Sequence, residues 1–209
     1  MTIQRSNLRL GLPLTLAALA ALWAAMLVLG GQSWDRTLLV GAYAGGQPTL
    51  VAAARWLTEA GGSTVLVPMS FAGALILFLV RRDWRAPILF LAITLSGRLL
   101  VELQKDWLHR LRPDANEHLV AAQSYAFPSG HSANAMMVWV GLALLFPPRW
   151  RGPALAAVAL LVLAVGASRV MLGVHWPSDV VGGWSFGLFW LLLLRTFEGS
   201  RKGYSRASR

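Results

Sequence analysis

Residues 168–179 read SRVMLGVHWPSD and join two apolar segments, 153–174 and 177–194. Each segment is close to the length that the hydrocarbon core of a bilayer requires. Gly173 is expected to end the first helix, and Pro177 to begin the second, because proline is tolerated in the first turn of a helix. The stretch therefore predicts two membrane helices joined by a short turn, with His175 and Asp179 at the boundary between lipid and water.

Apolar segments of similar length recur along the rest of the chain. A short helix over residues 49–60 is expected to lie at the membrane interface, with Trp56 at headgroup depth. The fold class predicted is all-α: a polytopic membrane protein of six transmembrane helices, with this interfacial helix between the first two. Residues 1–197 are expected to form a single domain, and 198–209 a basic, disordered cytoplasmic tail. The six predicted spans are 10–30, 64–80, 86–108, 128–146, 153–174 and 177–194.

The composition agrees with a membrane protein and excludes several other classes. Of the 209 residues, 56% are hydrophobic and 13% charged, which is too apolar for a soluble domain of this size. There is no cysteine, so thiol nucleophiles and thiolate metal sites are excluded. The formal net charge of +10 does not indicate nucleic acid binding, because the basic residues lie in short loops and tails between apolar segments.

The distribution of these basic residues predicts the orientation in the membrane. Most of the 19 Lys and Arg residues fall on the cytoplasmic side if both termini are cytoplasmic. An even number of spans then places three polar clusters together on the external side. In a bacterium this is the periplasmic face of the inner membrane. The clusters are Lys105 with Arg112-Pro113, Pro128-Ser129-Gly130-His131, and Ser168-Arg169 with His175 and Asp179.

Each cluster suits a phosphate site, and each also has a purely structural explanation. Lys105 and Arg112 would share one helical face if the helix continued to Pro113, and both groups bind phosphate oxygens. They could equally be interfacial cations. Ser129, Gly130 and His131 open a helix whose free N–H groups attract anions, or they could be an ordinary helix cap.

The third cluster pairs an imidazole with a carboxylate. Asp179 follows His175 by four residues and can accept its N–H, which fixes the tautomer and leaves the other nitrogen free. The structural alternative is that Asp179 complements the dipole of the helix that begins at Pro177.

Taken together, the three clusters resemble the three-part signature of the type 2 phosphatidic acid phosphatase superfamily, in order and in internal spacing. The resemblance covers about residues 50–195. It implies that His175 is the nucleophile that forms a phosphohistidine, that Asp179 orients it, and that His131 is the general acid and base. It also implies that the substrate phosphate is held by Lys105, Arg112, Ser129, Gly130 and Arg169, with no metal and no cofactor.

The expected substrate is a lipid phosphate or pyrophosphate in the surrounding membrane. Undecaprenyl pyrophosphate is ranked first, ahead of phosphatidylglycerophosphate and phosphatidic acid. No nucleic acid and no protein partner is expected. A lipid phosphotransferase that uses the same histidine, a zinc site at His131, His175 and Asp179, and a non-catalytic lipid transporter are the alternatives. Arg98 and Glu102 are expected to form an ion pair that supports Lys105, or else to contact the substrate.

Overall fold

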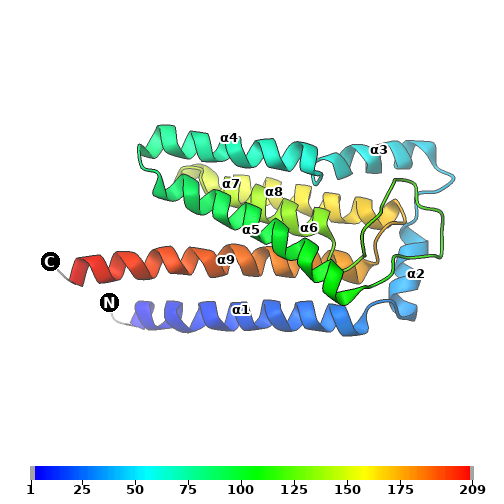
Figure 1. Cartoon of the computed structure of the whole chain (residues 1–209), viewed down its shortest axis with the longest axis horizontal. Helices are drawn as coiled ribbons and strands as arrows, with labels where there is room; N and C mark the ends of the chain where they lie inside the picture. Colours follow the sequence, from blue (N-terminus) through cyan, green and yellow to red (C-terminus); the bar gives the residue numbers. More distant parts are fainter. Residues whose placement is uncertain (1–2, 208–209) are drawn as a thin grey trace.

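A computed structural model describes the backbone of residues 3–207 and the side chains of residues 11–194. This part of the chain contains helices and no strands, so the all-α prediction is confirmed. The elements are α1 (Ile3–Leu29), α2 (Ser33–Ala42), α3 (Pro48–Glu59), α4 (Ser63–Arg81), α5 (Arg85–Leu108), α6 (Gly130–Ala135), the π-helical segment η1 (Met136–Val140), α7 (Gly141–Ala143), α8 (Pro148–Met171) and α9 (Pro177–Ala207) (Figure 1).

Within the described residues, five helical segments are long and apolar enough to cross a membrane. They are Gly11–Leu29, Pro48–Arg81, Arg85–Leu108, Pro148–Met171 and Pro177–Leu194. The remaining predicted span, 128–146, is helical from Gly130 but is divided among α6, η1 and α7. A sixth crossing therefore stays a prediction.

Of the two short helices in the N-terminal half, one was predicted from the sequence and the other was not. The short helix expected over 49–60 is present as α3, and Gly61 and Gly62 separate it from α4. Its position at the membrane interface stays a prediction. The helix α2 was not predicted from the sequence. The predicted tail, 198–209, lies outside the described side chains and also stays a prediction.

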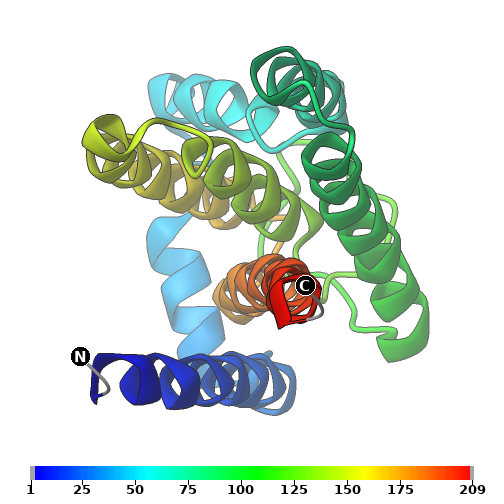
Figure 2. The ribbon, with the colours of Figure 1, turned by 90° about the vertical axis from the view of Figure 1, so that its left-hand side faces the viewer.

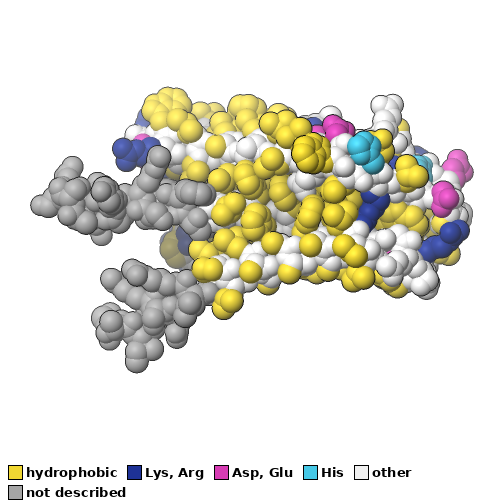
Figure 3. Space-filling view, turned by 60° about the horizontal axis from the view of Figure 1, so that its bottom comes forward, with side chains coloured by type: hydrophobic (Ala, Val, Ile, Leu, Met, Phe, Trp, Pro, Cys, Tyr) yellow, Lys and Arg dark blue, Asp and Glu magenta, His cyan; other side chains and the backbone are white. Residues whose placement is uncertain are grey.

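The helices run side by side, and one end of the bundle differs from the other (Figure 1). The N-terminal end of α1 and the C-terminal end of α9 lie at the left, whereas α2 and the loop 109–127 cover the right-hand end. A backbone hydrogen bond from Ala44 to Met171, the last residue of α8, and one from Leu119 to the next residue, Leu172, hold these connections in place. In Figure 3 apolar side chains cover most of the visible flank, and charged side chains appear mainly toward the two ends of the bundle.

Viewed along the bundle, α9 lies between α1 on one side and the group formed by α5, α6 and α8 on the other (Figure 2). Its contact with α6 is close because small residues face that helix. A Cβ added to Gly183 would lie 2.6 Å from the carbonyl oxygen of Ser129, and one added to Gly187 would lie 2.6 Å from that of Ala133. Small residues four apart allow this approach of two backbones in a membrane. They bring the start of α6 against the start of α9.

We expect Gly187→Ala to destabilise the protein by about 1–3 kcal/mol, because the added methyl group must push α6 away from α9. Thermal unfolding in detergent should show a lower midpoint. Gly152→Ala is the matched control, since a Cβ at Gly152 meets nothing within 4 Å. That change should be neutral or stabilising by about 0.5–1 kcal/mol. Equal midpoints for both variants would contradict the close α6–α9 contact.

Candidate active site

His175 lies in the turn between α8 and α9. Gly173 makes this turn with a φ of +74°, a value that glycine adopts without strain. The imidazole is 2% exposed, and its Nδ1 lies 3.4 Å from Oδ2 of Asp179, a residue that is fully buried. The backbone N–H of Trp176 donates to the same oxygen at 2.9 Å. With Nδ1 directed at the carboxylate, Nε2 is the nitrogen that remains for other partners.

Arg112 approaches that second nitrogen. Its Nη1 lies 3.2 Å from Nε2 of His175 and donates to the carbonyl oxygen of Val174 at 2.5 Å. Lys105 and Arg112 do not share one helical face, because the helix does not continue to Pro113. The helix α5 ends at Leu108, and His109 caps it in the left-handed conformation with a φ of 48°. The loop, rather than helical periodicity, brings Arg112 to His175.

Lys105 joins the same group from the last turn of α5. Its Nζ donates to Oε1 of Glu102 at 3.1 Å and to Oγ of Ser124 at 3.2 Å. Ser124 also accepts from Arg112, through its carbonyl oxygen at 2.7 Å. A Cβ added to Gly130 would lie 3.3 Å from Nζ of Lys105, so the start of α6 borders this ammonium. Ser124 lies outside every motif, and nothing in the sequence distinguished it.

Arg169 contributes the third cation of the group. Its side chain is 5% exposed and donates from Nη1 to Oγ1 of Thr58 at 2.7 Å. Its Nε is buried without a hydrogen-bond partner. A buried donor of this kind is costly unless a ligand satisfies it. Lys105, Arg112 and Arg169 are hereafter called the cation cluster, and they offer a binding site for an anion with several oxygens.

The α6 cluster lies between these groups and α9. The N–H of Ser129 donates to the backbone oxygen of Asp179 at 2.9 Å, and its buried hydroxyl accepts from Ser132 at 3.0 Å. The ring of His131 packs near Gly61, where an added Cβ would lie 3.3 Å from its Cδ2. His131 is close enough to His175 for the two imidazoles to interact electrostatically. The structure thus brings the eight predicted site residues to one end of the bundle.

The predicted ion pair between Arg98 and Glu102 is not formed among the described side chains. Glu102 pairs with Lys105 instead, and Arg98 donates to Oγ of Ser63 at 2.5 Å. Residues three apart on a helix are neighbours just as residues four apart are, and Lys105 is the nearer cation. Of the two residues, only Glu102 therefore contacts Lys105.

Sequence reasoning missed two charged residues behind the site. Arg110, in the loop 109–127, donates from Nη1 to Oδ1 of Asp179 at 3.0 Å. Asp35, at the start of α2, is fully buried and accepts from the backbone N–H of Ser178 at 2.9 Å. One signal was available for the second residue, since Asp35 is the only acidic residue before Glu59.

The described part of the chain contains no group of three or more His, Cys, Asp or Glu side chains placed to share a metal ion. Both oxygens of Asp179 face hydrogen-bond donors, which are Arg110 on one side and Trp176 with His175 on the other. The cation cluster lies beside them. The donor set of this site fits an anion.

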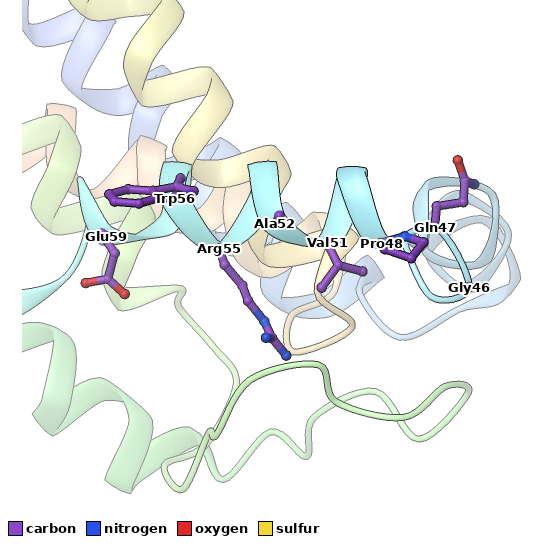
Figure 4. Close-up of a pocket in the computed structure, with 8 residues that line it drawn as sticks. All are labelled: Gly46, Gln47, Pro48, Val51, Ala52, Arg55, Trp56 and Glu59. Atoms are coloured by element: carbon purple, nitrogen blue, oxygen red, sulfur yellow. The ribbon is translucent and has the colours of Figure 1, made fainter.

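A groove of about 630 Å³ runs along α3 near the cation cluster. In Figure 4 the Arg55 side chain points from α3 toward the loop, where its Nη2 donates to the carbonyl oxygen of Leu119 at 2.8 Å. Glu59 lies at the end of the groove and interacts electrostatically with Arg169. The groove is lined by Gly46, Gln47, Pro48, Val51, Ala52, Arg55, Trp56 and Glu59.

Comparison with known proteins gives consistent matches. Residues 85–202 match the family model described as "PAP2 superfamily". The chain is 34% identical over 179 residues to phosphatidylglycerophosphatase B of Bacillus subtilis (strain 168), which covers 83% of this chain and 87% of that protein. It is 38% identical over 133 residues to the lipid A 1-phosphatase of Rhizobium johnstonii, covering 58% of this chain and 50% of that one.

Among solved structures, the crystal structure of a transmembrane PAP2-type phosphatidylglycerolphosphate phosphatase from Bacillus subtilis superposes with a TM-score of 0.81. The two chains are 29% identical, and the match covers 89% of this chain and 96% of that chain.

The environment of His175 predicts how stability depends on pH. Burial, and then the positive charges of Arg112 and Arg169, lower the pKa of His175 well below its ordinary value. The folded protein therefore keeps this imidazole neutral, whereas the unfolded chain takes up a proton below about pH 6.5. Since the unfolded state binds more protons there, stability falls as the pH drops through that value.

We expect the thermal midpoint in detergent to be lower at pH 5.5 than at pH 8, for the reason above. In His175→Gln this difference should shrink, because the replaced side chain does not titrate. A difference of the same size in both proteins would show that His175 is protonated to the same extent in the folded and unfolded states.

Proposed function

This chain belongs to the PAP2 superfamily, and from that premise we propose that it is an integral-membrane phosphatase that removes the terminal phosphate of phosphatidylglycerophosphate. The observation that carries the proposal is the arrangement around His175, with Asp179 at one ring nitrogen and Arg112 of the cation cluster at the other. A phosphate held by Arg112 would lie next to Nε2. This is the position needed for attack on phosphorus.

The proposed reaction has two steps. In the first, Nε2 of His175 forms a bond to phosphorus while the bond from phosphorus to the lipid oxygen breaks, and His131 gives that oxygen its proton. In the second, water attacks phosphorus and loses a proton to His131, which frees inorganic phosphate and restores His175. The cation cluster neutralises the charge on the phosphate oxygens in both steps, with Ser129 and the Gly130 N–H as further donors.

The choice of lipid differs from the sequence-based ranking, which placed undecaprenyl pyrophosphate first. The match to phosphatidylglycerophosphatase B extends over most of both chains, and the superposed structure is that of a phosphatidylglycerolphosphate phosphatase. Undecaprenyl pyrophosphate and phosphatidic acid become the comparison substrates. The proposed membrane is the bacterial inner membrane, crossed six times, with both termini cytoplasmic and the site external. The basic residues of the predicted cytoplasmic loops support that orientation.

We expect the purified full-length protein in detergent to release inorganic phosphate from phosphatidylglycerophosphate without an added acceptor. The specificity constant should exceed those for phosphatidic acid and undecaprenyl pyrophosphate. His175→Ala should abolish release and leave the protein folded, because no other group can accept the phosphoryl. Arg149→Ala, at the opposite end of the bundle, is the matched control.

Each outcome separates a different part of the proposal. A higher specificity constant for another lipid would replace the substrate and keep the reaction. Transfer to an acceptor lipid without free phosphate would make the protein a phosphotransferase. Full activity in His175→Ala would refute the mechanism.

We further propose that turnover needs no metal ion, because three fixed cations already surround the phosphate position. Phosphate release should persist after dialysis against a strong chelator. Loss of activity that zinc alone restores would instead support a metal site at His131, His175 and Asp179.

A further inference from the structure

Arg110 connects the proposed catalytic pair to the N-terminal helices. Its Nη1 donates to Oδ1 of Asp179 at 3.0 Å and to Oγ of Ser178 at 3.1 Å. Its Nη2 donates to the carbonyl oxygen of Met26 at 2.9 Å and also to that of Leu27. The last turn of a helix leaves such carbonyl groups without intrahelical partners. One guanidinium therefore satisfies the end of α1 and the start of α9 together.

Asp35 completes this contact from α2. Its Oδ2 accepts from Oγ of Ser178 at 2.6 Å and from the N–H of Gly31 at 2.8 Å, and its Oδ1 accepts from the N–H of Ser178 at 2.9 Å. Ser178 thus lies between Asp35 and Arg110. The network consists of two acids, one cation and one hydroxyl, and its polar groups are paired within the protein.

The network restricts the carboxylate that faces His175. Asp179 is fully buried, and a buried charge is costly unless an opposite charge and hydrogen bonds compensate it. Oδ2 of Asp179 faces the Trp176 N–H and Nδ1 of His175, and Arg110 donates to the remaining oxygen, Oδ1. The guanidinium is itself held, because its Cζ lies 4.4 Å from the centroid of the Phe127 ring. A carboxylate fixed in this way can orient an imidazole more sharply than one free to rotate.

We propose that Arg110 is a positioning residue for the His175–Asp179 pair, and that Asp35 anchors it through Ser178. The helices α1 and α2 then contribute to catalysis although they lie outside residues 85–202, the part that matches the family. Arg110 does not touch the phosphate in this proposal. It acts on the rate of phosphoryl transfer through the orientation of His175, whereas the cation cluster acts on phosphate binding. The inference rests on the proposed phosphatase function.

The first test measures kcat and KM of the full-length protein in detergent with phosphatidylglycerophosphate as the probe. Arg110→Gln should lower kcat by 10- to 100-fold and change KM by less than threefold, by analogy with the loss of a group that orients a catalytic imidazole. Arg110→Lys should recover part of kcat, because it restores the charge facing Asp179. Arg36→Gln, an exposed position next to Asp35, is the matched control and should equal the wild type.

The second test asks whether Arg110 acts through Asp179. In a double-mutant cycle, Arg110→Gln should lower kcat much less in the Asp179→Asn variant than in the wild type. Effects that multiply would show that the two residues act independently, and this would overturn the proposal. A kcat of Arg110→Gln within threefold of the wild type would also overturn it.

The third test does not depend on turnover. The protein has four histidines, so the ring nitrogens of His175 can be assigned in a labelled sample by comparison with His175→Gln. Arg110→Gln should change the populations of the two imidazole tautomers, and Arg36→Gln should not. An unchanged tautomer in a folded Arg110→Gln protein would refute the positioning role. If the wild type itself released no phosphate, the proposed function would fail while this spectroscopic result still stood.

Discussion

The site depends on Asp179, which contacts His175 of its own cluster, Ser129 of the second cluster and Arg110 of the loop. Its side chain binds His175 and the Trp176 N–H on one oxygen and Arg110 on the other. Its backbone carbonyl accepts from Ser129 at 2.9 Å, which ties the start of α6 to the start of α9. Because the carboxylate is fully buried, its side-chain contacts offset the cost of removing it from water. One residue therefore ties both His175 and the start of α6 to the start of α9.

The cation cluster imposes a second constraint, which is repulsion between like charges. Lys105, Arg112 and Arg169 are close enough to affect one another electrostatically, and Glu102 is the acid that pairs with one of them. Like charges held together in a poorly hydrated site repel, and they are stabilised by a bound anion. The buried Nε of Arg169, which has no hydrogen-bond partner, likewise favours a bound anion. Lys105 and Arg169 are buried, so the proposed phosphate would replace water as the partner of their charges.

Close helix packing makes this possible in a membrane, where the hydrophobic effect gives no drive for helices to associate. The Gly183 and Gly187 contacts bring α9 onto α6, and the loop 109–127 then crosses the same end of the bundle. The loop delivers Arg110, Arg112 and Ser124 to the site. A segment without regular structure thus supplies both Arg112, which is a proposed phosphate ligand, and the contact of Arg110 with Asp179.

The amino-acid sequence by itself determined the helical membrane fold and the place of α3 along the chain, because hydrophobic length and local spacing are properties of the chain. It also predicted eight candidate site residues, whose roles stay proposals. The helix does not continue to Pro113, so the condition for Lys105 and Arg112 to share a helical face is not met. The predicted ion pair between Arg98 and Glu102 was wrong, since the choice of ion-pair partner depends on the surroundings. The roles of Arg110 and Asp35 were decided only by tertiary structure. Their partners lie 69 and 143 residues away in the chain, and no local pattern records a contact over such a separation.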